Sequence, residues 1–209
     1  MKLGFVHIPK TAGTAIREAL RRTDKHTCVY AGGYHDRYSD FKQRFAGCDK
    51  VIAFVRNPYD RHISQCEEEL AFFAKNKHGP FRKPFAMTKA YGYEGVMQLS
   101  RAEWGQYGRE KAYYPWACQY EYISDKEGVI YPNVTVFKID ANAEGKEKYG
   151  GLKALESLLG VKVLVKNKSH LSKKQTLNTA EFLLHAPLLK ATINSHYAED
   201  FERFNYEIL

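Results

Sequence analysis

The stretch Lys2-Leu-Gly-Phe-Val-His-Ile8, followed directly by Pro9-Lys-Thr-Ala-Gly-Thr14, decides the fold. Its first half is an apolar run typical of a buried strand, which we expect at about residues 2–8. Its second half is a small-residue turn that leads into a helix expected near residues 14–22. Such a turn directs free backbone N–H groups and the positive end of the helix dipole toward one point. Together with Lys10 and two threonine hydroxyls, that point forms a seat for a phosphate or sulfate group.

A second segment has the same layout, because Val51-Ile-Ala-Phe-Val55 is followed by Arg56-Asn-Pro-Tyr-Asp-Arg-His-Ile-Ser64. The apolar run is typical of a parallel strand that is covered on both faces. Asn57-Pro58 matches the cap and first position of a helix, which we expect to reach about residue 73. The guanidinium of Arg56, at the end of the strand, is suited to a second phosphate. We therefore expect one ligand with two separated anionic groups.

The same residues argue against Mg-dependent phosphoryl transfer. A P-loop kinase needs the pattern Gly-x-x-x-x-Gly-Lys-[Ser/Thr] and an acid at the end of a neighbouring strand to hold the metal. Here Lys10 precedes Gly13, and the neighbouring strand ends in Arg56, whose charge would oppose a divalent cation. Metal-free transfer from a nucleotide fits these residues better, and a P-loop kinase remains an alternative.

Strands and helices alternate along the rest of the chain. Further strands or extended segments are expected at residues 27–31, 134–139 and 161–165, and further helices at residues 151–159 and from Pro187. Such alternation implies an α/β protein, which we expect to have a P-loop-like three-layer fold with a mainly parallel central sheet flanked by helices. The length of 209 residues predicts a single domain, 1–209, with an irregular helical acceptor-binding insertion around 75–117.

Composition limits the partners and the compartment. The formal net charge of +8 indicates an anionic partner, which charge alone does not separate into nucleotide, nucleic acid or acidic polysaccharide. Because no apolar run reaches the roughly 18–20 residues of a membrane span and no signal pattern opens the chain, we expect a soluble, cytoplasmic protein. The cysteines lack a C-x-x-C spacing, so we expect free, mostly buried thiols and no metal site. They are Cys28, Cys48, Cys66 and Cys118.

At these residues the sequence resembles the sulfotransferases that use 3′-phosphoadenosine 5′-phosphosulfate (PAPS), especially the carbohydrate branch that includes the uronosyl 2-O-sulfotransferases. The segment His7–Thr14 is similar to that family's 5′-phosphosulfate loop, and Arg56–Ser64 is similar to its 3′-phosphate motif. The similarity continues through Gln119–Ile123, Asn167–Ser169 and His196–Tyr206. The stretch 75–117 matches no motif of the family.

The resemblance implies PAPS as co-substrate, no metal, and a set of donor-binding residues. That set is Lys10, Thr11, Ala12, Gly13, Thr14, Arg56, Ser64 and Ser169. Lys10 would also be catalytic, since its ammonium would neutralise the charge that builds on the bridging oxygen as the sulfuryl group leaves. Structural alternatives are an ordinary helix cap for Thr14 and a helix-surface serine for Ser64. We expect Arg61 to face solvent and pair with a carboxylate.

Transfer to a hydroxyl also needs a base that removes its proton. The best candidate is His35, which follows a short strand and a Gly-Gly turn on the side of the sheet where both anion loops open. It resembles the histidine that uronosyl 2-O-sulfotransferases use as base, which is likewise followed after a gap by Asp-Phe. The alternatives are His7, expected to be structural, and His62, on a helix.

The predicted function is transfer of a sulfuryl group from PAPS to an acceptor hydroxyl, with carbohydrate as the expected acceptor class and His35 as base. The partners are then a nucleotide donor and a small-molecule or carbohydrate acceptor, with no nucleic acid expected. A non-catalytic binder of acidic polysaccharide or nucleic acid is the alternative from another class. The aromatic rings between Tyr91 and Trp116 fit either an acceptor-binding surface or ordinary core packing. The lysines at 166, 168 and 173 fit either contacts to the donor or to an acidic acceptor, or a solvated run of charges.

Overall fold

The computed structural model of the protein describes residues 1–30, 37–75, 117–140, 150–164 and 183–209. The chain divides into two compact units. The first unit consists of the described residues within Met1–Asn57, Ala117–Lys166 and Glu199–Tyr206. The second unit consists of the described residues within Pro58–Trp116, Asn167–Ala198 and Glu207–Leu209. In these ranges no helix combines the length and the apolar character that crossing a membrane requires.

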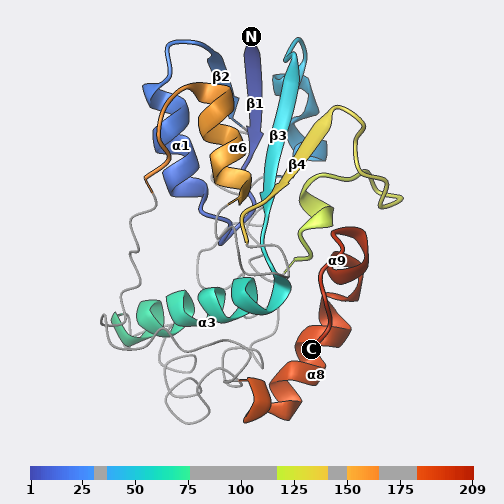
Figure 1. Cartoon of the computed structure of the whole chain (residues 1–209). Helices are drawn as coiled ribbons and strands as arrows, with labels where there is room; N and C mark the ends of the chain where they lie inside the picture. The colour runs from blue at the N-terminus through green and yellow to red at the C-terminus, as the bar shows by residue number, and fades with distance from the viewer. Residues whose placement is uncertain (31–36, 76–116, 141–149, 165–182) are drawn as a thin grey trace. The chain divides into compact units, whose positions relative to one another are not determined.

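The first unit is built on a four-stranded sheet with the strand order β2-β1-β3-β4 (Figure 1). The strands are β1 (Lys2–Val6), β2 (Thr27–Tyr30), β3 (Lys50–Val55) and β4 (Val134–Lys138). Every neighbouring pair runs parallel, with Phe5 opposite both Tyr30 and Ile52. The expected parallel α/β sheet is therefore confirmed, whereas the described residues 161–164 join no strand.

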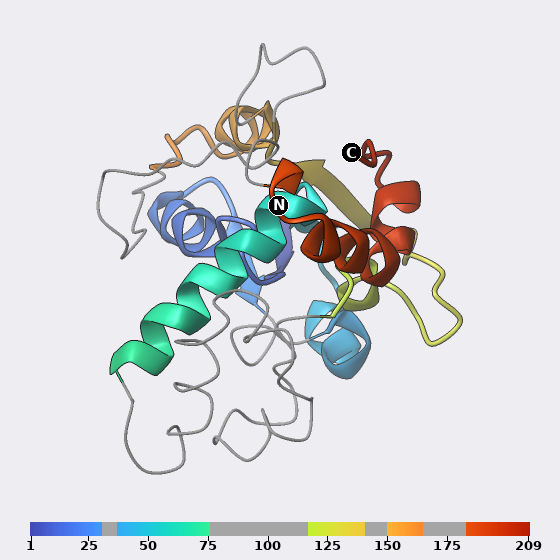
Figure 2. The same ribbon diagram turned by 90° about the horizontal axis from the view of Figure 1, so that it is seen from below.

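Two helices cover one face of this sheet, α1 (Gly13–Arg22) and α6 (Gly150–Leu159) (Figures 1 and 2). Alternate strand residues point into the core below them, including Phe5 of β1 and Phe54 of β3. Full burial of each such ring stabilises the fold by roughly 1.5–3 kcal/mol. Gly151 lets α6 lie directly on the sheet, because a Cβ there would come 2.1 Å from the carbonyl oxygen of Lys138.

The opposite face is covered by a short helix, α2 (Tyr38–Phe41), and the 3₁₀ turn η1 (Lys42–Phe45). Gly4 alternates with Leu3 and Phe5 and so faces this side, where a Cβ would meet the Phe45 ring at 2.6 Å. Tyr38 stacks on Phe45 with ring centroids 5.1 Å apart. Helices therefore lie on both faces of the sheet, as the expected three-layer arrangement requires.

The second unit contains α3 (Pro58–Lys75) and α8 (Pro187–His196), which pack against each other (Figure 2). Both begin at the proline from which the sequence predicts a helix. The hydroxyl of Tyr59, in the first turn of α3, donates to Asn194 of α8. It also accepts the backbone N–H of Leu209 at 2.9 Å.

The expectation for Arg61 is wrong, since its side chain is buried instead of facing solvent. Only 1% of it is exposed, and its guanidinium lies 5.6 Å from the centroid of the Tyr197 ring. His62 and Gln65 are buried with it. Residues four apart share a helix face, so Arg61 and Gln65 turn to the same side of α3. The buried side of a helix is predicted from its apolar residues, so polar residues that are buried on that side are predicted to face solvent.

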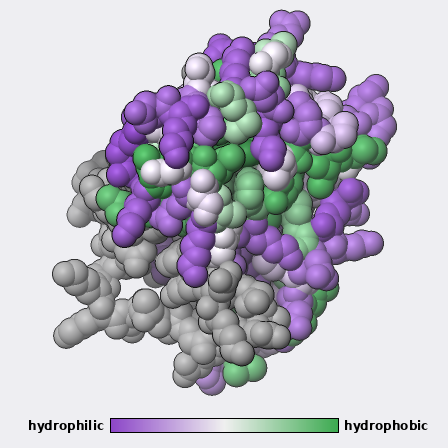
Figure 3. Space-filling view, turned by 45° about the horizontal axis from the view of Figure 1, so that its top comes forward, coloured by the Kyte–Doolittle hydropathy of each residue, from purple (hydrophilic) through white to green (hydrophobic). Residues whose placement is uncertain are grey.

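Hydrophilic side chains cover most of the described surface on the face that Figure 3 shows, with hydrophobic side chains between them. All four cysteines are free thiols. Cys66 and Cys118 are buried, while Cys28 and Cys48 are half-buried. The expectation of free thiols is thus confirmed, and that of burial holds for two of them.

Candidate functional site

The loop between β1 and α1 has an unusual backbone. Lys10 and Ala12 both lie in the left-handed region, with φ of 64° and 59°. For a residue other than glycine this conformation costs roughly 1–2 kcal/mol. A backbone of alternating hand turns successive N–H groups toward a common side, which makes a concave seat for an anion. Strain of this kind is found at functional loops, where the surrounding fold enforces it.

The helix that follows this loop begins without a side-chain cap. Its N-cap is Ala12, which has no side-chain oxygen to accept the first N–H groups of α1, and no acidic side chain lies in the first turn. The alternative role of Thr14 as the cap is therefore wrong, and its side chain is exposed. The N–H groups of this first turn are available to an anion or to water.

Thr11 stabilises the loop from within. Its side chain is fully buried, and its hydroxyl donates to the carbonyl oxygen of Ile8 at 2.8 Å. This hydrogen bond spans three residues and closes the turn before α1. Thr11 therefore contributes its hydroxyl to the shape of the loop, which leaves its backbone N–H as the group that a ligand could contact.

Gly13 makes room for a neighbouring ring. A Cβ at Gly13 would lie 1.7 Å from Nε2 of His7. The His7 ring in turn stacks on Phe5, with centroids 5.7 Å apart. Packing against the loop and the core agrees with the structural role expected for His7.

Arg56 brings the two sequence segments together at the carboxyl edge of the sheet. Its Nη1 donates to the carbonyl oxygen of Lys10 at 3.5 Å, the long end of the hydrogen-bond range. Its Nε lies 3.9 Å from Oδ1 of Asp140. For Nη2 the described part of the chain offers no hydrogen-bond partner. Both loops thus open at the same edge, as the parallel strands predict, with part of the guanidinium fork available.

Asp140 was not among the residues predicted from the sequence. It follows β4, and its Oδ2 accepts both the backbone N–H of Asn57 and the hydroxyl of Tyr206, the latter at 3.0 Å. Burial, and then the charge of Asp140 and the hydrogen bond to it, raise the pKa of Tyr206, so its hydroxyl stays protonated as a donor. The signal that could have found Asp140 is an acid just after a predicted strand. Its contacts are those of a carboxylate that orients Arg56.

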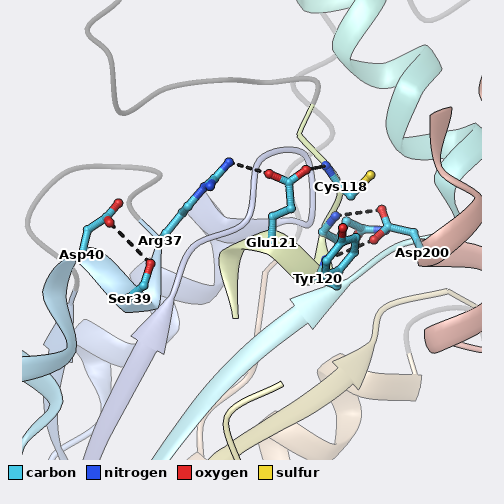
Figure 4. A network of polar contacts seen from close by, with 8 residues as sticks. Arg37, Ser39, Asp40, Cys118, Tyr120, Glu121 and Asp200 are labelled. Carbon is cyan, nitrogen blue, oxygen red and sulfur yellow. Dashed lines mark hydrogen bonds and ion pairs between the residues drawn. The ribbon is translucent and has the colours of Figure 1, made fainter. Parts of the chain in front are cut away.

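The backbone of Arg56 is held by the side chain of Gln119, which is fully buried. Oε1 of Gln119 accepts the N–H of Arg56 at 2.8 Å, and Nε2 donates to the carbonyl oxygen of Arg56 at 2.9 Å. Gln119 precedes the 3₁₀ turn η3 (Tyr120–Tyr122), whose start is held by Asp200 of α9 (Ala198–Arg203). Asp200 accepts the N–H groups of Gln119 and Tyr120 at 2.8 and 3.0 Å (Figure 4).

A second carboxylate in the same network ties η3 to the chain around α2. Oε1 of Glu121 accepts the N–H of Cys118 at 3.1 Å, and its Oε2 pairs with Arg37 at 2.5 Å (Figure 4). Arg37 is the first described residue after the predicted base. His35 itself lies outside the described residues, as do Ser169, the rings between Tyr91 and Trp116, and the lysines at 166, 168 and 173.

Two remaining predicted residues belong to α3 of the second unit. Ser64 is half-buried there. His62 is 3% exposed, and burial, followed by the positive charges of Arg61 and His196, lowers its pKa to about 3. The residues that the structure brings together are therefore the loop around Lys10 and the arginine at position 56.

Comparison with known proteins adds no assignment, because no family model and no curated protein matches the chain. Support for a function therefore comes from the sequence motifs and from the geometry of the site.

Proposed function

We propose that the protein is a sulfotransferase that moves a sulfuryl group from PAPS to an acceptor hydroxyl, with carbohydrate as the expected acceptor class. The observation that carries the proposal is the contact between Nη1 of Arg56 and the carbonyl oxygen of Lys10. It places a forked cation beside a helix N-terminus that has no side-chain cap and follows two left-handed residues. A ligand with a phosphosulfate at one end and a 3′-phosphate at the other matches these two features in charge.

Each residue then has a role in binding or transfer. The donor supplies an activated bond between sulfur and the oxygen that bridges to phosphorus. The N–H groups of the loop from Thr11 to Thr14 hold the phosphosulfate oxygens, and the Lys10 ammonium neutralises the charge on the bridging oxygen as its bond to sulfur breaks. His35 takes the proton of the attacking hydroxyl. Arg56 binds the 3′-phosphate, while Ser64 and Ser169 stay donor contacts that only the family resemblance implies.

Thermal unfolding with adenosine 3′,5′-bisphosphate, the donor product, tests the binding part of this proposal. In the presence of a chelator, a ligand at 100 times its Kd should stabilise the wild-type protein by about 2.7 kcal/mol. Arg56→Ala should lose most of this stabilisation, because it removes the cation that faces the 3′-phosphate. Arg21→Ala is the matched control, since it removes the same charge from an exposed position at the other end of α1.

The outcomes separate the candidate functions. A non-catalytic polyanion binder would be stabilised by DNA, with a steep loss on adding salt, and would show no preference for adenosine 3′,5′-bisphosphate over adenosine 5′-phosphate. A kinase would need ATP and Mg²⁺. If adenosine 3′,5′-bisphosphate stabilised Arg56→Ala as much as the wild-type protein, Arg56 would not be the residue that binds the 3′-phosphate. The transfer step is tested by a screen in which labelled sulfate from PAPS is offered to glycans, lipids and phenols.

A further inference from the structure

Arg56 stands at a place where the sheet no longer provides hydrogen-bond partners for its backbone. The carbonyl oxygen of Val55 accepts the N–H of Ile139 next to β4. Because the C=O and N–H of one peptide unit point in opposite directions, the N–H of Arg56 points away from β4. On that other side β1 ends at Val6, which is paired with Ala53, so no strand residue reaches Arg56.

The side chain of Gln119 takes the place of the missing strand. Its amide makes one hydrogen bond to each backbone group of Arg56, at 2.8 and 2.9 Å. A primary amide has the same donor and acceptor as a peptide group, so it can continue the ladder by one residue. Methionine would fill a similar volume but leave both backbone groups of Arg56 without these bonds.

Gln119 is fixed in turn by a buried carboxylate. Asp200 is fully buried, and its two oxygens accept the N–H groups of Gln119 and Tyr120 (Figure 4). Hydrogen bonds to a charged acceptor are shorter and stronger than those between neutral groups. Asp200, Gln119 and their hydrogen bonds to Tyr120 and Arg56 form a continuous connection that we call the Asp200–Gln119 clamp.

We propose that Gln119, held by Asp200, is a positioning residue that sets the backbone of Arg56 and thereby selects ligands that carry a 3′-phosphate. This inference rests on the proposed function and extends it. Asp140 orients the guanidinium through Nε, and the clamp fixes the peptide from which that side chain extends. With both in place, the guanidinium reaches a phosphate without first having to be ordered, which lowers the entropic cost of binding.

Calorimetric titration of two ligands tests this role, namely adenosine 3′,5′-bisphosphate and adenosine 5′-phosphate, which lacks the 3′-phosphate. Gln119→Met should raise the Kd of the bisphosphate by about tenfold, equivalent to about 1.4 kcal/mol. The Kd of the monophosphate should change less than about twofold, because its contacts lie in the loop before α1. Gln43→Met, the same substitution at an exposed glutamine, should change neither Kd.

A second variant and a double-mutant cycle keep the test decisive if Gln119→Met folds poorly. Gln119→Asn keeps the amide but is one methylene too short to reach both groups of Arg56. Like Gln119→Met, it should weaken binding of the bisphosphate more than binding of the monophosphate. In the Arg56→Ala background neither substitution at Gln119 should alter the ratio of the two affinities further, because the group that it positions is gone.

Three results would overturn the inference. They are an equal loss of affinity for both ligands, an unchanged affinity for the bisphosphate, and an additive effect in the Arg56→Ala background. Equal affinity of the wild-type protein for the two ligands would have another meaning. It would show that the protein does not recognise the 3′-phosphate, which contradicts the proposed function on which the inference rests.

Discussion

At the scale of single residues, the loop before α1 is shaped by a contact between a glycine and a histidine. Gly13 is the first residue of α1, where alanine would ordinarily be favoured by about 1 kcal/mol. The His7 ring occupies the space that a Cβ would need. That ring is stacked on Phe5 and cannot swing away as a flexible side chain would. Glycine is therefore required here by a neighbour and not by its own helical backbone.

Gly13→Ala should destabilise the protein by about 1–3 kcal/mol, the usual cost of overpacking a filled site. In a His7→Ala background the sign should reverse, because the space is then open and helix propensity favours alanine by up to about 1 kcal/mol. The free energy of unfolding in urea, measured for the four proteins of this cycle, checks both signs. A similar destabilisation with and without the His7 ring would show that the contact is not the cause.

The same residues show what a sequence pattern can and cannot predict. Arg56 follows an apolar run directly, and Lys10 follows another after Pro9, so the parallel-sheet rule alone places them at one edge, and their contact confirms this. The left-handed conformation of Ala12 was not predicted, because glycine is the usual signal for it and alanine carries none. Thr11 was expected to offer its hydroxyl to a ligand, whereas the structure directs it to Ile8, since a local hydrogen bond of this kind depends on loop shape.

At the scale of elements, the strands and most helix starts follow from local patterns, but the connections between them do not. The bonds from Gln119 to Arg56 and from Asp200 to Gln119 join residues 63 and 81 positions apart. Asp140 reaches Tyr206 across 66 positions. Each of these residues is a common polar type with no periodicity around it. Only the folded arrangement of η3, α9 and β4 shows that they converge on Arg56.

The end of α9 controls one of these connections. Asn205 has a φ of 48°. Its N–H donates to the carbonyl oxygen of Glu202, and the N–H of Tyr206 donates to the carbonyl oxygen of Phe201 at 2.9 Å. This is the Schellman pattern, in which a left-handed residue ends the helix. It turns the chain so that the hydroxyl of Tyr206 reaches Asp140.

Asn205→Ala should therefore destabilise the protein by about 1 kcal/mol, because a Cβ without a compensating side-chain amide is disfavoured in the left-handed region. Asn205→Gly should leave stability unchanged or slightly raised, since glycine adopts this conformation without steric cost. Urea unfolding of the two variants beside the wild type provides the comparison. Equal stability of the alanine and glycine variants would mean that backbone conformation at this position is not limiting.

At the scale of the whole molecule, the buried His62 ring couples stability to pH. Burial, and then the charges of Arg61 and His196, hold the pKa of this ring at about 3 in the folded protein. The unfolded chain protonates the same ring near pH 6.5. Between these values the unfolded state binds a proton that the folded state does not, so stability is lost as the pH falls below about 6.5.

The expected contribution of His62 is a fall of about 2 kcal/mol in the free energy of unfolding from pH 7 to pH 5, at about 1.4 kcal/mol per pH unit below 6.5. His62→Asn removes the titrating ring while an amide can still bond to the Tyr197 hydroxyl, so the stability of this variant should fall by about 2 kcal/mol less over the same interval. His185→Asn, the same change at an exposed histidine, should keep the wild-type dependence. If the stability of the His62 variant falls in parallel with that of the wild type, the buried ring is not what makes the fold sensitive to acid.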